Sequence, residues 1–184
     1  MADEVEHHQL AETPEDVLER RAASLALETL DEEISDQLSL LLFRIADEWY
    51  AVAVGDVREI FQEYTITEIP CVPDFILGVV NVRGEILSVT DPARLMHLGA
   101  VTSTDGEAPP AVVIANEDTA TALVVDEIGD IAEVPNGAVE PPVSIIDRAQ
   151  AEFISGSVYI NGNMIGTLNV ERLLEPIVGS TGRS

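Results

Sequence analysis

The amino-acid sequence predicts an all-β protein, namely two pseudo-symmetric five-stranded small β-barrels with one helix added before them. Three observations support this fold class. The same residue pattern occurs twice along the 184-residue chain. The apolar runs are short and are separated by turn-forming residues, and helical spacing is confined to one early segment and a few turns. Barrels suit such short strands because closing a sheet on itself removes its exposed edges.

The repeat is a single duplication and not a long array. The run Phe75-Ile76-Leu77-Gly78 reappears 78 positions later as Phe153-Ile154-Ser155-Gly156. The apolar run Leu40–Phe43 matches Ala111–Ile114 at an offset of 71 positions. The larger offset further along the chain indicates that the second half contains a longer loop.

Residues 1–36 form an acidic N-terminal extension with 12 acidic and 2 basic residues. Thr13 is a suitable N-cap, and Pro14 suits the first position of a helix. Apolar residues then recur at helical spacing. The sequence predicts an amphipathic helix at about residues 14–29, which either packs on its own domain or binds a partner.

Residues 37–101 are predicted to form the first barrel half. Short apolar runs on either side of a polar turn are typical of β-hairpins. Asp91 followed by Pro92 predicts a short helical turn, because an acidic N-cap precedes a proline at the first helical position. The predicted strands are Leu40–Ile45, Trp49–Val54, Ile76–Val82 and Ile86–Thr90.

Residues 102–184 are predicted to form the second barrel half and a C-terminal helical turn. A polar junction at residues 102–110 separates the halves, and a long loop is expected at residues 135–152. Asn169 is a good N-cap at the position that matches Asp91 in the first half. The predicted strands are Ala111–Ala115, Ala120–Val125, Phe153–Ile160 and Met164–Leu168.

The charge of the chain is extreme, with 34 acidic residues against 9 basic ones and a net charge of −25. All the basic residues are arginine. Such a charge repels nucleic acids and anionic membrane surfaces, which bind clustered positive charge. Self-repulsion of this kind opposes folding in dilute buffer. The composition therefore predicts a protein adapted to a salt-rich cytoplasm; an ordinary acidic protein is the alternative.

No recognisable motif indicates catalysis. The sequence contains no glycine-rich phosphate loop, no nucleophile elbow and no cysteine or histidine spacing typical of a metal site. The single cysteine, Cys71, excludes an internal disulfide and is expected to be a small apolar filler before a strand. We therefore expect no enzyme, no cofactor and no metal, and a function based on recognition between surfaces.

The most specific motif of the chain is Gly78-Val79-Val80-Asn81-Val82-Arg83-Gly84-Glu85. Val57-Arg58-Glu59-Ile60, Ile154-Ser155-Gly156 and the segment from Asn169 to Leu174 accompany it. Together these motifs resemble the chemotaxis coupling protein family, the CheW-like domain, over about residues 38–175. The resemblance implies two intertwined five-stranded barrels similar to Src-homology-three domains, and it leaves open an exchange of strands between the halves.

The resemblance also implies a non-enzymatic chemotaxis adaptor in the cytoplasm, associated with receptor arrays at the inner face of the membrane. Its implied partners are the cytoplasmic tip of a chemoreceptor (a methyl-accepting protein) and the regulatory domain of a chemotaxis histidine autokinase. Two alternatives stay open: a CheW-like regulator of a signalling kinase outside chemotaxis, and a small-molecule-binding protein that uses the cleft between the barrels. No apolar run approaches the ~18 residues of a membrane span, so no membrane insertion is expected.

In this family the groove between the barrels takes the receptor tip. Arg83 is the first candidate because its repeat partner, Asn161, carries no charge. Its guanidinium either contacts the receptor or forms an internal salt bridge that holds the turn, with Glu85 beside it. The receptor-binding residues that the resemblance implies are Val57, Glu59, Ile60, Gly78, Arg83 and Ile131.

Two of these candidates have structural alternatives. Ile60 could be a core residue, and we expect this more of Ile60 than of Val57. Gly78 is matched by Gly156, which suggests a β-bulge or a close approach of two backbones. For the kinase, the candidates are the apolar loop residues Val143, Ile145 and Ile146, which could equally be buried in the protein's own fold.

We predict that the melting temperature rises strongly between dilute buffer and molar salt. The reason is that the screening length falls to about 3 Å at 1 M salt, which suppresses the self-repulsion of the acidic chain. Calorimetry across a salt series measures the effect. A melting temperature that is independent of salt would contradict the prediction.

Overall fold

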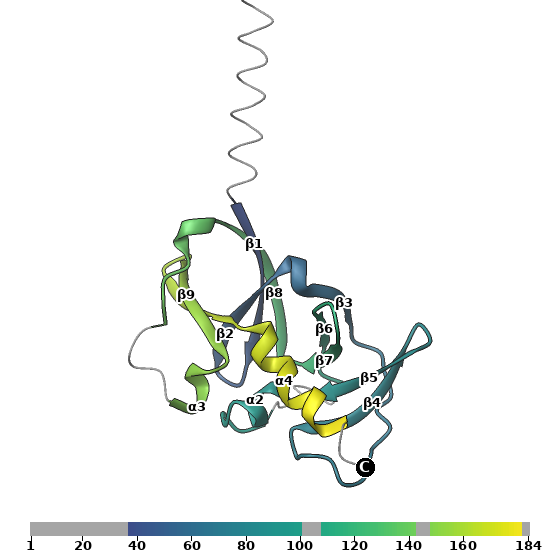
Figure 1. Cartoon of the computed structure of the whole chain (residues 1–184). Coiled ribbons are helices and arrows are strands. Elements are labelled where there is room, and N and C mark those ends of the chain that lie inside the picture. The colour runs from purple at the N-terminus through teal and green to yellow at the C-terminus, as the bar shows by residue number, and fades with distance from the viewer. Residues whose placement is uncertain (1–36, 101–107, 143–147, 182–184) are drawn as a thin grey trace, which may run out of the picture. The chain divides into compact units, whose positions relative to one another are not determined.

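The computed structural model describes residues 37–100, 108–142 and 148–181 (Figure 1). The described residues from Leu38 onward belong to one compact unit. The helix predicted at residues 14–29 and the kinase candidates Val143, Ile145 and Ile146 lie outside the described residues.

The described residues contain ten strands and little helix. The strands are β1 (Gln37–Ile45), β2 (Glu48–Ala53), β3 (Val57–Phe61), β4 (Ile76–Val82), β5 (Glu85–Thr90), β6 (Ala111–Ala115), β7 (Ala120–Val124), β8 (Glu127–Pro135), β9 (Ile154–Ile160) and β10 (Asn163–Leu168). The helices are α2 (Pro92–Leu95), α3 (Arg148–Ala151) and α4 (Val170–Thr181), with 3₁₀ turns at Val54–Asp56 and Asn136–Ala138.

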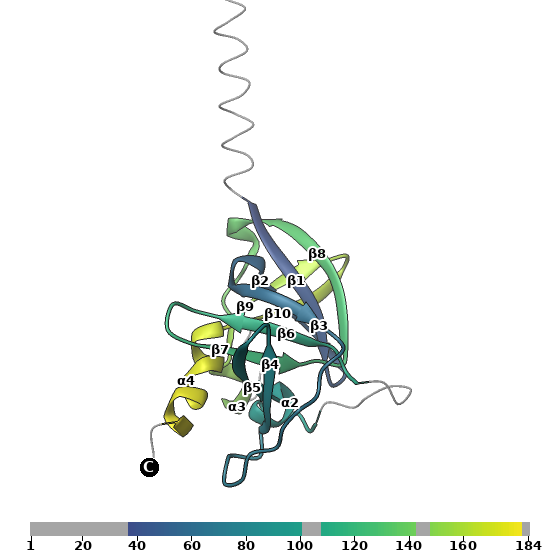
Figure 2. The same ribbon diagram turned by 90° about the vertical axis from the view of Figure 1, so that its right-hand side faces the viewer.

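The strands form two five-stranded sheets, seen from two sides in Figures 1 and 2. The β1 sheet has the order β8-β1-β2-β10-β9, and the β6 sheet has the order β3-β6-β7-β5-β4. Each sheet therefore joins the first hairpin of one half to the last three strands of the other half. The prediction of an all-β chain with two five-stranded units is confirmed.

The two halves repeat the same local structure. The hairpins β4–β5 and β9–β10 have equivalent bounds at the offset of 78 positions that the sequence shows. Each contains a register shift at its start: Ile76 pairs with Thr90 and Ile154 with Leu168, one residue out of step with the rest of the hairpin. Because bulges re-aim a strand and are retained features of a fold, this shared irregularity confirms the duplication.

Alternate side chains of β1 enter two different cores. Leu41, Phe43 and Ile45 belong to a central core between the two sheets. Leu40 belongs to a smaller core within the β1 sheet. Strand β6 divides its side chains in the same way, with Val112 and Ile114 in the central core and Ala111 and Val113 in the core of the β6 sheet.

Both predicted helix caps are present. The Asp91 carboxylate accepts hydrogen bonds from the backbone N–H groups of Ala93 and Arg94 at 2.9 and 3.1 Å. Asn169 Oδ1 accepts from the N–H of Arg172 at 3.2 Å. These bonds satisfy N–H groups that have no partner within the helix. Helix α4 is longer than the expected turn, because its apolar side chains, including Leu173, pack into the central core.

Cys71 differs from the sequence-based expectation, since it is exposed and does not fill the core. Its backbone has a φ of 61°. The residue therefore lies in a surface turn between Pro70 and Pro73, where the fixed φ of proline favours turns over strands.

Gly78 is required by a close approach of two backbones. A Cβ atom there would lie 2.3 Å from the carbonyl oxygen of Thr67. Thr67 and Val79 are joined by two backbone hydrogen bonds of 2.8 and 2.9 Å. Gly156 repeats the arrangement, with its Cβ position 2.5 Å from the carbonyl oxygen of Glu140. Both suggestions for Gly78, a bulge and a close approach, are confirmed.

We predict that Gly78→Ala destabilises the fold by about 2 kcal/mol, because the new methyl group clashes with backbone and the φ of 145° strains an L-residue. Gly55→Ala is the matched control, since nothing lies within 4 Å of its Cβ position. Denaturant unfolding of both variants measures the difference. Equal stability of the two variants would contradict this account of Gly78.

Candidate functional site

A groove runs between β3 of the β6 sheet and β8 of the β1 sheet. We call it the docking groove. Its exposed apolar side chains are Ile60, which is 43 % exposed, and Ile131, which is 58 % exposed. Large exposed apolar side chains that share a hollow indicate a surface covered by a partner. The hollow measures about 280 Å³ and is lined by Leu41, Val54, Val57, Arg58, Glu59, Ile60 and Ile131.

We expected Ile60 to be a core residue more than Val57, and this expectation was wrong. Val57 is half-buried and packs against the central core, whereas Ile60 is exposed. Burial alternates along β3, and because Val57 and Ile60 are three residues apart they lie on opposite faces of the strand. The face of β3 that carries Val57 is turned to the central core, so Ile60 is left on the outer face.

Arg83 and Glu59 form an ion pair at the edge of the docking groove. Arg83 Nη2 donates to Glu59 Oε1 at 2.7 Å. The expected neighbour of Arg83, Glu85, pairs instead with Arg58, at 2.6 Å between Nη2 and Oε2. Of the two alternatives for Arg83, the internal salt bridge is present, yet 82 % of the Arg83 side chain stays exposed. The guanidinium is thus held in place and is accessible to a partner.

The Arg58–Glu85 pair was not anticipated as part of the site. The hydrogen bond that Arg58 donates lowers the pKa of the Glu85 carboxyl, and the same bond raises the pKa of the Arg58 guanidinium. Nearby, burial raises the pKa of Asp56, and the negative charge of Glu171 adds to the effect. The two ion pairs link β3 to the end of the β4–β5 hairpin, and so they fix this edge of the docking groove.

The backbone of Arg83 is unusual for an arginine. Its φ is 52° and that of Gly84 is 91°, so both central residues of the turn are left-handed. Such two-residue turns strongly prefer Asn-Gly, and the matching turn of the second half is indeed Asn161-Gly162, with φ values of 51° and 81°. An arginine at a position that favours asparagine suggests a role beyond the turn itself.

Gly78 does not line the docking groove. It supports the crossing segment at Ile66 and Thr67. The residues just before that segment, Tyr64 and Thr65, line a hollow that also contains Arg83. A substitution at Gly78 would therefore reach the site only by displacing backbone.

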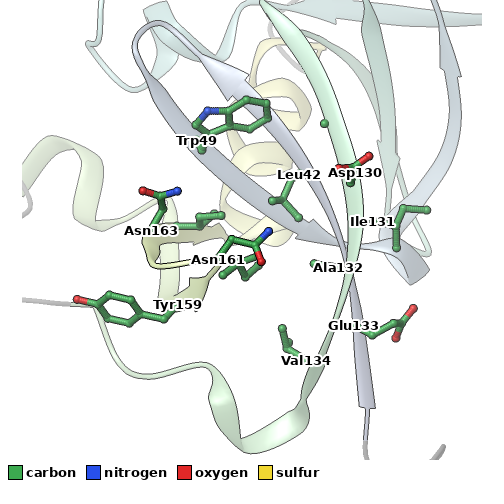
Figure 3. Close-up of a pocket in the computed structure, with 13 residues that line it drawn as sticks. Leu42, Trp49, Asp130, Ile131, Ala132, Glu133, Val134, Tyr159, Asn161 and Asn163 are labelled. Atoms are coloured by element: carbon green, nitrogen blue, oxygen red, sulfur yellow. The ribbon is translucent and has the colours of Figure 1, made fainter.

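A second, larger hollow lies between the edge strands β8 and β9 (Figure 3). We call it the β8–β9 hollow. It measures about 830 Å³. Tyr159, which is 70 % exposed, stands at one side, and Trp49 lies at another. The sequence analysis missed this site, although comparing the two halves position by position would have revealed it. Its lining is Leu42, Trp49, Gly129, Asp130, Ile131, Ala132, Glu133, Val134, Tyr159, Ile160, Asn161, Asn163 and Ile165.

In the described part of the chain, no three His, Cys, Asp or Glu side chains come together in a way that could hold a metal ion. Nor does any described helix have the length and apolar character that crossing a membrane requires.

Comparison with known proteins identifies the family. The profile of the CheW-like domain matches residues 39–177, which is most of the chain. The chain belongs to the CheW-like domain family. It is 29 % identical over 140 residues to the chemotaxis protein CheW of Treponema pallidum, covering 75 % of this chain and 82 % of that protein. It is 30 % identical over 135 residues to the probable chemotaxis protein CheW of Rhizobium etli, covering 73 % of this chain and 85 % of the relative.

The fold agrees with that of a CheW-like protein of known structure. The scaffolding protein TtCheW from Thermoanaerobacter tengcongensis superposes with a TM-score of 0.65 at 24 % identity, covering 72 % of this chain and 88 % of TtCheW. The CheW-like match from residue 39 to residue 177 includes β3, β8 and the β4–β5 turn. The docking groove and its two ion pairs therefore belong to the CheW-like part of the chain.

We predict that Arg83→Asn leaves stability unchanged or raises it by up to about 1 kcal/mol. The lost ion pair is exposed and contributes about 0.2–1 kcal/mol, whereas a non-glycine residue in a left-handed conformation costs roughly 1–2 kcal/mol, less for asparagine. Urea unfolding measures the difference. A loss greater than about 1 kcal/mol would show that the turn depends on this ion pair.

Proposed function

We propose that this chain is a chemotaxis adaptor that joins the cytoplasmic tips of chemoreceptors to a histidine autokinase and regulates the kinase. Its membership of the CheW-like family and its chemotaxis relatives support the role in chemotaxis. The two partners are part of the proposal. So is the absence of catalysis, because an adaptor acts by positioning other proteins and biasing their conformations.

The observation that carries the proposal is the docking groove. Ile60 and Ile131 come from different sheets and line one hollow, with the ion pair of Arg83 and Glu59 at its edge. The resemblance to chemotaxis coupling proteins implies a receptor tip that is a helical hairpin, and an amphipathic helix lays its apolar face into such a groove. The exposed guanidinium of Arg83 would then meet a carboxylate or a helix C-terminus, where cations are favoured.

Gly78 contributes to receptor binding indirectly in this proposal. Its place under Thr67 sets the path of the segment that leads into β4. Strand β4 in turn carries the turn with Arg83. The kinase contacts proposed at Val143, Ile145 and Ile146 rest on the apolar character of the loop alone.

The decisive experiment is a reconstitution in molar salt from this chain, a receptor signalling fragment and the candidate kinase. We expect the chain to raise receptor-dependent kinase activity, and Arg83→Asn to lower the affinity for the receptor fragment by about tenfold, the loss of a moderate interface contact. Ile60→Ala should have a similar effect through lost apolar contact. Autophosphorylation rates and sedimentation of the complex provide the two readouts.

Arg172→Gln is the matched control, because Arg172 also forms an exposed ion pair, with Glu175 at 2.8 Å, but lies on α4 outside the groove. Equal binding of Arg83→Asn and the wild-type chain would reject the groove assignment. Stimulation of the kinase that never requires a receptor would favour a regulator outside chemotaxis.

A further inference from the structure

The two halves differ at the opening between their edge strands. In the first half this opening lies between β3 and β4, and in the second between β8 and β9. The lining residues correspond through the repeat: Glu59 matches Asp130, and Phe61 matches Ala132. The first opening has a hollow of about 390 Å³, whereas the β8–β9 hollow measures about 830 Å³.

The first half fills its opening with its own side chains. Phe61 packs edge-to-face on Tyr64, with ring centroids 5.2 Å apart. The hydroxyl of Tyr64 donates to the carbonyl of Pro109 at 2.6 Å. Across the opening, the pairs Arg83–Glu59 and Arg58–Glu85 connect β3 to the β4–β5 hairpin.

The second half lacks these fillers at the matching positions. Ala132 replaces the ring of Phe61, and neutral residues replace three of the four ion-pair partners. Only the carboxylate is retained, because Asp130 stands at the position that matches Glu59. Asp130 has no ion pair among the residues that the structure describes. The replacements are Gly129 for Arg58, Asn161 for Arg83 and Asn163 for Glu85, and each of them lines the β8–β9 hollow.

Other features show that the β8–β9 hollow is suited to a ligand. The ring of Trp49 lies over Gly129, where an added Cβ would be 2.6 Å from the ring, so any side chain at Gly129 would displace it. Val134 and Ile165 form an apolar floor. Asp130 and Glu133 lie on β8 and add negative charge, with Glu133 already accepting from Ser39. Figure 3 shows Trp49 at the top of the view and Tyr159 at the lower left, with β8 on the right.

We infer that the β8–β9 hollow is a second docking site and that its occupant is a segment of a partner protein with an arginine next to a large apolar side chain. The partner supplies the two groups that the first half supplies to itself. Its guanidinium pairs with Asp130 and stacks on Trp49, as guanidinium groups do on aromatic faces. Its apolar side chain fills the space above Ala132. The inference does not rest on the proposed function, although Ile131 lines both the docking groove and the β8–β9 hollow.

Trp49 provides a direct readout, because it is the only tryptophan of the chain. We would titrate the whole chain with acetyl-Phe-Arg-amide and record tryptophan fluorescence excited at a wavelength that spares tyrosine. Acetyl-Phe-citrulline-amide is the matched control peptide, with the same shape and no charge. We expect saturable binding of the arginine peptide, about fivefold tighter than that of the control, which is near the most that an exposed ion pair contributes.

Two variants complete the test. Asp130→Asn should reduce the affinity for the arginine peptide to that of the citrulline peptide. The double variant Ala132→Phe with Asn161→Arg copies the first half and should abolish binding of both peptides; should this variant misfold, Asp130→Asn alone decides. Equal binding of the two peptides, or no saturable fluorescence change, would overturn the inference. Self-association of the wild-type chain that the double variant removes would also overturn it, because the occupant would then be a second copy.

Discussion

The central core between the two sheets is the constraint on which the rest of this structure depends. Strand β6 is buried on both faces and β1 on the face toward the central core, and residues such as Phe43 and Ile114 are fully inaccessible. Each large apolar side chain buried in this way contributes about 1.5–3 kcal/mol relative to exposure. Separating the sheets would expose many of them at once, so the two sheets keep one relative position. That position places β3 beside β8 and gives the docking groove its shape.

Strand exchange extends the same constraint to the whole domain. Each sheet joins a hairpin of one half to three strands of the other half, so neither half can complete its sheet alone. The parallel pairs β2 with β10 and β5 with β7 make two of these junctions, and β3 with β6 and β8 with β1 make the others. A groove wall on β3 is therefore connected through β6 and β7 to β5 and the Arg83 turn. A partner that displaces one edge of the groove acts on a packed unit, and such units shift between discrete arrangements more readily than they deform.

Local signals explain why much of the fold could be predicted from the sequence. The helix cap at Asp91 and the glycine at position 78 depend on a few neighbouring residues. The repeat shows each of these features a second time, at Asn169 and Gly156. The partners of Arg83 and Glu85 could not be predicted, because their pairing requires β3 to lie beside the β4–β5 hairpin, which local pattern does not reveal. The exposure of Ile60 was misjudged because alternation puts Val57 and Ile60 on opposite faces of β3 but does not reveal which of the two faces meets the core.

The charge of the chain decides which contacts can matter in the docking groove. All five arginine side chains that the structure describes are paired with carboxylates of the same chain. The few positive charges of the chain therefore already interact within the protein. In the molar salt that the composition predicts, charges farther apart than about 3 Å hardly interact, and long-range steering of a partner is lost. Apolar burial, in contrast, is maintained or strengthened by many salts. Ile60 and Ile131 should then contribute to binding through apolar burial, while Arg83 contributes only at hydrogen-bond distance, where it also selects the orientation of the partner.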